Sequence, residues 1–165
     1  MNQVPGNKGD DGTEIAEYLK LFYPFHYRVG FTVENALRGR QLSQHQAVIL
    51  WIVHSEGEQG LAMRRKDIEQ RIGTWFDITS SAISKALRSL ARAEQPFINI
   101  AEDPSSGREK RVTLTAEGQR EVQRMIARAE AVIATIVAEL SPGEVQSGLT
   151  FLRRVSEIVA TLDGD

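Results

Sequence analysis

A small set of side chains at helical spacing has the right chemistry to contact a polyanion: Ser81, Ser84, Lys85 and Arg88. Residues three and four apart share one face of a helix, so a helix formed by SSAISKALRSL would present all of them on one side. This face is basic, and none of these positions carries a carboxylate. Small hydroxyl groups between cations allow close approach to DNA and leave donors for base edges. The face therefore indicates a DNA-reading helix.

A second basic group follows directly along the chain. The segment DPSSGREK predicts a turn, because Pro, Ser and Gly favour turn geometry, and it places Arg108, Lys110 and Arg111 at or near the tip. Short apolar runs at 97–100 and 112–115 flank the turn and predict the two strands of a hairpin. A helix followed by a basic hairpin is the order of a winged helix-turn-helix, in which the helix enters the major groove and the hairpin, or wing, reaches the minor groove or the backbone.

The predicted reading helix also has an apolar face, formed by residues 83, 86, 87 and 90, which would pack it onto a core. A shorter helix is predicted over 65–72, ended by Gly73. Arg65 and Lys66 at its start suit phosphate contacts, and the alternative is a solvated charge cluster. Trp75 and Phe76 in the following link are expected to fill the core of the lobe, although aromatic side chains can also bind a ligand or stack on a base.

The remaining chain predicts long helices. One spans 13–39 with a break or kink near Pro24, and another, over 44–55, begins with a capping box of Ser43 and Gln46. A helix from Thr115 to about Leu140 would be about 37 Å long, which exceeds what one small lobe can cover. A last helix begins at Ser141. The first and last helices with a second subunit would bury the excess apolar surface, and the alternative is a monomer with a helical hairpin.

These patterns predict a mainly α chain with a small β-hairpin wing, of the α+β class: a winged helix-turn-helix lobe joined to a helical dimerisation region. We expect a disordered tail at 1–12, an N-terminal dimerisation helix at 13–40, the DNA-binding lobe at 41–118 and C-terminal dimerisation helices at 119–165.

The motifs resemble the MarR (multiple antibiotic resistance regulator) family over about residues 12 to 163. AISKALRSL is followed by a wing with the family's residues at Asp103, Pro104, Arg108, Val112, Leu114, Thr115 and Gly118. MRRKDIEQRIG and QLSQHQAVIL are similar to the family's two preceding helices. The sequence departs from the family at Ser106, where the family has a second acid, and in a longer link, GTWFDIT.

The resemblance implies a dimeric transcriptional regulator, a repressor on a pseudo-palindromic operator, released by a small aromatic or phenolic effector. In such proteins the effector pocket lies between the dimerisation helices and the DNA-binding lobe. Aromatic side chains with polar tips suit such a ligand, and they serve equally well as core residues. The candidates for the effector site are Tyr23, His26, Tyr27, Trp51 and His54.

Composition and charge are compatible with this assignment. Of the 165 residues, 41% are hydrophobic and 25% are charged, as in ordinary globular proteins, and the absence of cysteine excludes disulfides and thiolate zinc sites. The net charge is -2, but residues 64–124 hold 12 Lys and Arg against 9 Asp and Glu, and the remainder holds 8 against 13. A DNA-binding lobe on an acidic body fits this asymmetry. No signal peptide or spanning segment is recognised, so a cytoplasmic protein is expected.

Catalytic motifs are missing from the sequence. It contains no glycine-rich phosphate loop, no H-E-x-x-H and no G-x-S-x-G, and His26, His45 and His54 are too scattered for a metal motif. We therefore expect no enzyme activity, no cofactor and no metal site. The rival hypothesis is a protein-interaction module that kept a winged-helix fold and uses its basic face on an acidic protein partner.

Overall fold

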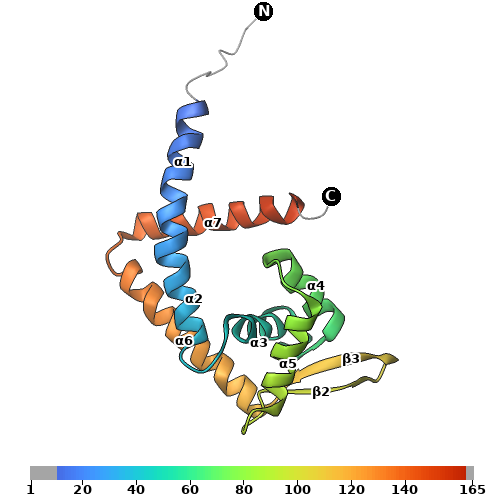
Figure 1. Cartoon of the computed structure of the whole chain (residues 1–165). Helices are drawn as coiled ribbons and strands as arrows, with labels where there is room; N and C mark the ends of the chain where they lie inside the picture. Colours follow the sequence, from blue (N-terminus) through green and yellow to red (C-terminus); the bar gives the residue numbers. More distant parts are fainter. Residues whose placement is uncertain (1–10, 163–165) are drawn as a thin grey trace, which may run out of the picture.

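A computed structural model describes residues 11–162 of the chain, and Figure 1 shows its arrangement. A long N-terminal helical arm leads into a small lobe, and two further helices follow the lobe. The mainly α class with a small β-sheet and the winged helix-turn-helix lobe are confirmed. Most of the predicted tail, residues 1–10, lies outside the described residues, and residues 11 and 12 already belong to the first helix.

The N-terminal arm is one continuous helical segment: α1 (Asp11–Phe25), the π-helical turn η1 (His26–Gly30) and α2 (Phe31–Arg38). Pro24 was predicted to start, break or kink a helix, and it lies inside α1, so neither a start nor a break occurs there. Proline removes one amide donor, and the wider π turn directly after it takes the place of a break. The predicted stop at Gly39 is confirmed, since this residue follows α2 with a φ of 60°.

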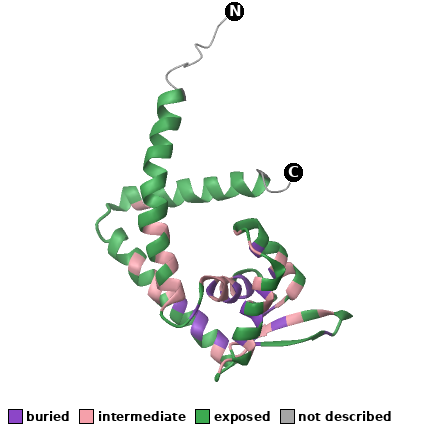
Figure 2. Ribbon diagram, in the orientation of Figure 1, coloured by how far each residue is buried: buried purple, intermediate pink, exposed green. Residues whose placement is uncertain are grey.

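Helix α3 (Gln44–Glu56) forms the centre of the lobe. Its predicted capping box is confirmed: the Ser43 hydroxyl accepts from the Gln46 amide at 3.3 Å, and the Ser43 amide donates to Gln46 Oε1 at 2.7 Å. Ile49, Leu50 and Ile52 on this helix are fully buried. Figure 2 shows the buried residues gathered on α3 and on the elements packed around it.

The sheet contains three antiparallel strands in the order β1-β3-β2. The hairpin of β2 (Ile98–Asp103) and β3 (Ser106–Leu114) was predicted, but both strands run further toward the tip than expected. Strand β1 (Ala62–Arg64) was not predicted, because three residues are too few to show an alternating pattern. The long strands leave only residues 104–105 as the turn.

Two helices form the helix-turn-helix. Helix α4 (Arg65–Trp75) continues through Gly73, so the predicted end at that residue is wrong; a glycine lowers helix stability without forbidding the helix. Helix α5 (Ser80–Arg92) buries the predicted apolar face, Ile83, Ala86, Leu87 and Leu90. This burial fixes which side of α5 faces outward.

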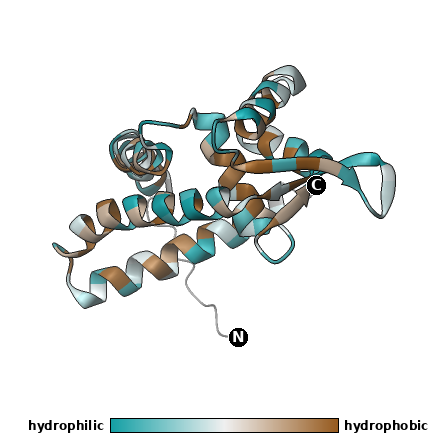
Figure 3. Ribbon diagram, turned by 90° about the horizontal axis from the view of Figure 1, so that it is seen from below, coloured by the Kyte–Doolittle hydropathy of each residue, from teal (hydrophilic) through white to brown (hydrophobic). Residues whose placement is uncertain are grey.

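The last two helices are α6 (Ala116–Val137), which ends before the predicted Leu140, and α7 (Pro142–Leu162). Val122 and Met125 anchor the first half of α6 in the lobe core. The second half of α6 and nearly all of α7 are exposed, as are most residues of α1 (Figure 2). Figure 3 shows many hydrophobic residues along these exposed helices. None of the helices between residues 11 and 162 is both long and apolar enough to span a bilayer.

Candidate nucleic-acid interface

The outward face of α5 carries the predicted reading residues. Thr79 caps the helix by accepting from the Ala82 amide at 3.3 Å. Ser81, Lys85 and Arg88 are exposed on the side opposite the buried face. The structure therefore presents a short, basic helical surface that is held in place by core packing.

Ser84, the fourth predicted reading residue, is half-buried and is held by hydrogen bonds. Its hydroxyl accepts from Nη2 of Arg65 at 2.8 Å and donates to the main-chain oxygen of Ser80 at 2.7 Å. The same arginine donates through Nε to Glu69 at 2.7 Å. Arg65 thus links α4 to α5, and its Nε and Nη2 already donate hydrogen bonds within the protein.

The predicted cations divide into two groups. Within residues 11–162, Lys66, Lys85, Arg88 and Arg108 form no ion pair. Arg65, Lys110 and Arg111 each pair with a carboxylate, and the ammonium of Lys110 lies 3.2 Å from Glu102. An unpaired exposed cation can bind a phosphate without first leaving a protein partner, so the first group is better suited to phosphate binding than the second.

Arg111 was predicted at or near the tip of the wing, and it lies within β3, opposite Ala101 and Arg64. Its guanidinium donates two hydrogen bonds to Glu58, at 2.9 and 2.6 Å. This contact holds the pKa of the Glu58 carboxyl below its ordinary value and raises the pKa of Arg111. The pair ties the wing to the loop before β1.

The wing turn is fixed by Asp103. Its buried carboxylate accepts from the amide and the hydroxyl of Ser105, at 2.9 and 2.7 Å, and these bonds lower the pKa of Asp103. The pairing of β2 with β3 is irregular between Glu102 and Asp103, and Arg108 lies in the unpaired stretch of β3 that results. Arg108 is exposed, and no hydrogen bond to Ser106 or to any other described residue orients it.

Two further cations belong to this surface. Arg92 is exposed on α5, four residues after Arg88, and its spacing would have identified it. Arg64 pairs with Asp67 at 2.8 Å and lies 3.6 Å from Glu109 of the wing, which links α4 to β3. No sequence pattern predicts this second contact, because it depends on how the wing folds back.

The predicted effector residues lie in three places. Tyr23, His26 and Tyr27 form an exposed aromatic cluster on the N-terminal arm, with ring centroids 5.1 Å apart for the two tyrosines and 5.0 Å apart for His26 and Tyr27. Trp51 and His54 each line a different hollow. Within a single described chain, these five side chains do not form one site.

The hollow beside Trp51 is apolar and has a volume of about 220 Å³. Leu37 of α2, Met125 of α6, Trp75 at the end of α4 and Phe76 directly after it also line the hollow. Phe76 packs against the core as predicted, but the prediction is wrong for Trp75, which is 48% exposed and has Arg71 over its ring at 5.9 Å. The helix α4 extends to Trp75 and carries its side chain to the rim.

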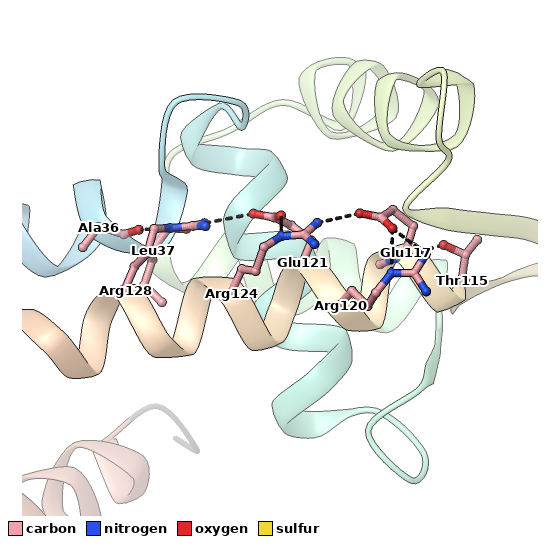
Figure 4. Close-up of polar contacts among 9 residues, drawn as sticks. Ala36, Leu37, Thr115, Glu117, Arg120, Glu121, Arg124 and Arg128 are labelled. Atoms are coloured by element: carbon pink, nitrogen blue, oxygen red, sulfur yellow. Dashed lines mark hydrogen bonds and ion pairs between the residues drawn. The ribbon is translucent and has the colours of Figure 1, made fainter.

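A row of ion pairs connects the N-terminal arm to the lobe (Figure 4). Arg128 of α6 donates to the main-chain oxygens of Ala36 and Leu37 at 2.8 and 2.9 Å, and to Glu121 at 2.9 Å. Glu121 is buried and also accepts from Arg124 at 2.7 Å. These bonds fasten the end of α2 to α6.

Comparison with known proteins agrees with this geometry. The family model of the winged helix DNA-binding domain matches residues 42–118, which contain α3, α4, α5 and the sheet. Residues 42–118 are therefore similar to a winged helix DNA-binding domain. A search of curated proteins found no match.

The fold of residues 11–162 is similar to the folds of solved MarR-family regulators. The transcriptional regulator Tm0710 of Thermotoga maritima is 17% identical, with a TM-score of 0.64 over 91% of this chain and 99% of that one. A mutant of S. aureus MepR bound to an oligodeoxyribonucleotide is 20% identical, with a TM-score of 0.55 over 86% of this chain and 97% of that one. BpsR of Bordetella bronchiseptica, whose DNA binding is regulated by 6-hydroxynicotinic acid, is 21% identical. Its TM-score is 0.57 over 87% of this chain and 98% of that one.

Proposed function

We propose that the protein is a sequence-specific DNA-binding transcriptional regulator that acts as a dimeric repressor. The observation that carries the proposal is the exposed face of α5, where Lys85 and Arg88 have no acidic partner within the described chain. Arg108 on the wing is likewise exposed and forms no ion pair with a described residue. Reading helix and wing are the two parts with which winged helix domains contact DNA.

In this mechanism α5 enters the major groove. Ser81, Lys85 and Arg88 approach base edges. Ser84 lies nearer the DNA backbone, because its hydroxyl is bound to Arg65. Arg108 reaches the minor groove beside the wing. Phosphate contacts come from Lys66, and from Arg65, Lys110 and Arg111 to the extent that DNA competes with their carboxylate partners.

The exposed apolar helices support a dimer. Ile15, Leu19 and Phe22 of α1 are each more than half exposed, and Leu152 and Ile158 of α7 are 52% and 44% exposed. Exposed apolar surface of this extent is usual where a partner binds. A second copy of the chain would cover it, and a two-fold dimer would present its two α5 helices to half-sites of a pseudo-palindromic operator one turn apart.

The apolar hollow supports an aromatic or phenolic effector. Its aromatic lining suits a flat ring, and Trp75 and Phe76 lie four and three residues before Thr79, the cap of the reading helix. A ligand that displaces these side chains would move the link and change the separation of the two α5 helices. Tyr23, His26 and Tyr27 would contribute only through dimer contacts, and His54 lies at a separate hollow.

The test is a fluorescence-anisotropy titration of the full chain against the DNA upstream of its own gene and against random duplex, at two salt concentrations. The proposal expects tighter, competitor-resistant binding to the upstream fragment. Equal and weak binding to both fragments would contradict it and would favour the rival function, an interaction module for an acidic protein.

A further inference from the structure

A third hollow lies at the end of α2, with a volume of about 270 Å³. It is lined by the loop after α2 and by one side of α6, and most of its lining side chains are arginines. Its charged lining residues are Arg38, Arg40, Glu121, Arg124 and Arg128. In a chain with a net charge of -2, this concentration of guanidinium groups needs an explanation.

The α6 arginines are held in fixed positions. Arg124 donates to Glu121 at 2.7 Å and to Glu117 at 2.5 Å, and Arg128 is bound to Glu121 and to two main-chain oxygens of α2. In the bonds formed within the described residues these two arginines use only Nε and Nη2. Their Nη1 groups therefore remain as oriented donors.

Arg38, the last residue of α2, and Arg40, in the loop after it, add positive charge that the two glutamates do not balance. Glu117 and Glu121 offset Arg124 and Arg128. Arg38 donates to the neutral side-chain oxygen of Asn35 at 3.0 Å, and Arg40 is exposed, with no hydrogen bond or ion pair to any described residue. The hollow thus has an excess of about two positive charges, with donors both fixed and free.

We propose that this hollow binds a small oxyanion, a phosphate or a polycarboxylate, between the loop after α2 and α6. Arginine binds the oxygens of either group in pairs, and guanidinium groups already oriented by protein bonds lose little entropy on binding. The wing extends away from the loop after α2 (Figure 1), so the phosphates of DNA bound at α5 and the wing lie elsewhere. The site differs from the apolar hollow in the class of its ligand and does not depend on the proposed DNA binding.

The experiment measures the melting temperature of the full chain as inorganic phosphate or citrate is added. Ionic strength is kept constant by removing an equivalent amount of chloride salt. A saturable rise is expected with at least one of the two. A rise with phosphate alone assigns a phosphate ligand, and a rise with citrate alone assigns a polycarboxylate. Arg40→Gln should raise the apparent Kd by about tenfold or more without unfolding the chain, because Arg40 makes no bond within the described fold.

The matched control is Arg153→Gln, which removes an exposed cation of α7 outside the hollow. This variant should keep the response of the unmodified chain. A rise that does not saturate, a response that survives Arg40→Gln, or an equal loss in Arg153→Gln would each overturn the proposal, since binding would then reflect general screening of charge.

Discussion

The guanidinium of Arg128 lies 2.9 Å from the carboxylate of Glu121, one of the two buried charged or polar side chains of the described chain. The same guanidinium caps the last carbonyl groups of α2, which a helix end leaves without partners. One side chain therefore neutralises a buried charge and joins two helices that are far apart in the sequence. We expect this contact to set the position of the N-terminal arm on the lobe.

Arg128→Gln should lower the free energy of unfolding by about 1–3 kcal/mol, because it leaves a buried carboxylate and two carbonyl oxygens short of donors. Chemical denaturation measures the change. The matched control is Arg154→Gln, whose pair with Glu157 is exposed on both sides and should contribute less than about 1 kcal/mol. Equal losses in the two variants would show that the buried pair has no special role.

Arg108→Ala should weaken binding to the upstream fragment by about tenfold. The fold should stay intact, since the Arg108 side chain makes no bond within the described fold. Anisotropy titration measures the effect. Lys110→Ala serves as the comparison and should have a smaller effect, because Lys110 is already paired with Glu102. An unchanged Kd for Arg108→Ala would remove this arginine from the mechanism.

Lys66→Gln should reduce the dependence of log K on log salt by about 0.9 for each copy bound, the contribution of one phosphate contact. Arg65→Gln should reduce it by less, because Glu69 and Ser84 already hold that guanidinium. Binding measured at several salt concentrations gives both slopes. A larger reduction in slope for Arg65→Gln than for Lys66→Gln would contradict this assignment of phosphate contacts.

The carboxyl of Glu58 should titrate below the ordinary glutamate value of about 4.3, because Arg111 stabilises its charged form. The stability from this pair is then present above the unfolded pKa and is lost as the pH falls through the lower, folded pKa. NMR titration of the side chain measures this, and Arg111→Gln should return the pKa toward its ordinary value. A pKa that does not respond to this substitution would deny the contact.

Trp51 and Trp75 are the two tryptophans of the chain, and both line the apolar hollow. Titration with a phenolic carboxylate such as salicylate should therefore change the intrinsic fluorescence in a saturable way. Trp75→Phe should keep ligand binding, detected through Trp51, with a changed amplitude. A ligand that releases the chain from DNA without any change in tryptophan fluorescence would place the effector site elsewhere.

Local patterns predicted the elements that carry the proposed DNA-binding face. The apolar spacing of α5, the Ser43 capping box and the start of α6 at Thr115 depend on residues within one or two turns, and all are confirmed. The reading face followed from the same periodicity, because the buried side of a helix determines its exposed side.

Contacts between distant residues were not predictable from such patterns. Arg111 and Glu58 are 53 positions apart, and Arg128 and Ala36 are 92 apart, so only the folded chain shows that they meet. The same holds for the short strand β1, which exists because β3 lies beside it. The exposure of Trp75 likewise depends on α4 running two residues beyond Gly73.

The central claim is that the outward face of α5 reads DNA sequence. The most direct test compares the ratio of Kd for random duplex to Kd for the upstream fragment in the unmodified chain, in Arg88→Ala and in Lys66→Gln. The account predicts a high ratio for the unmodified chain, a lower ratio for Arg88→Ala, and weaker binding to both DNAs with the ratio kept for Lys66→Gln. A ratio near one in the unmodified chain, or a ratio that Arg88→Ala leaves unchanged, would contradict it.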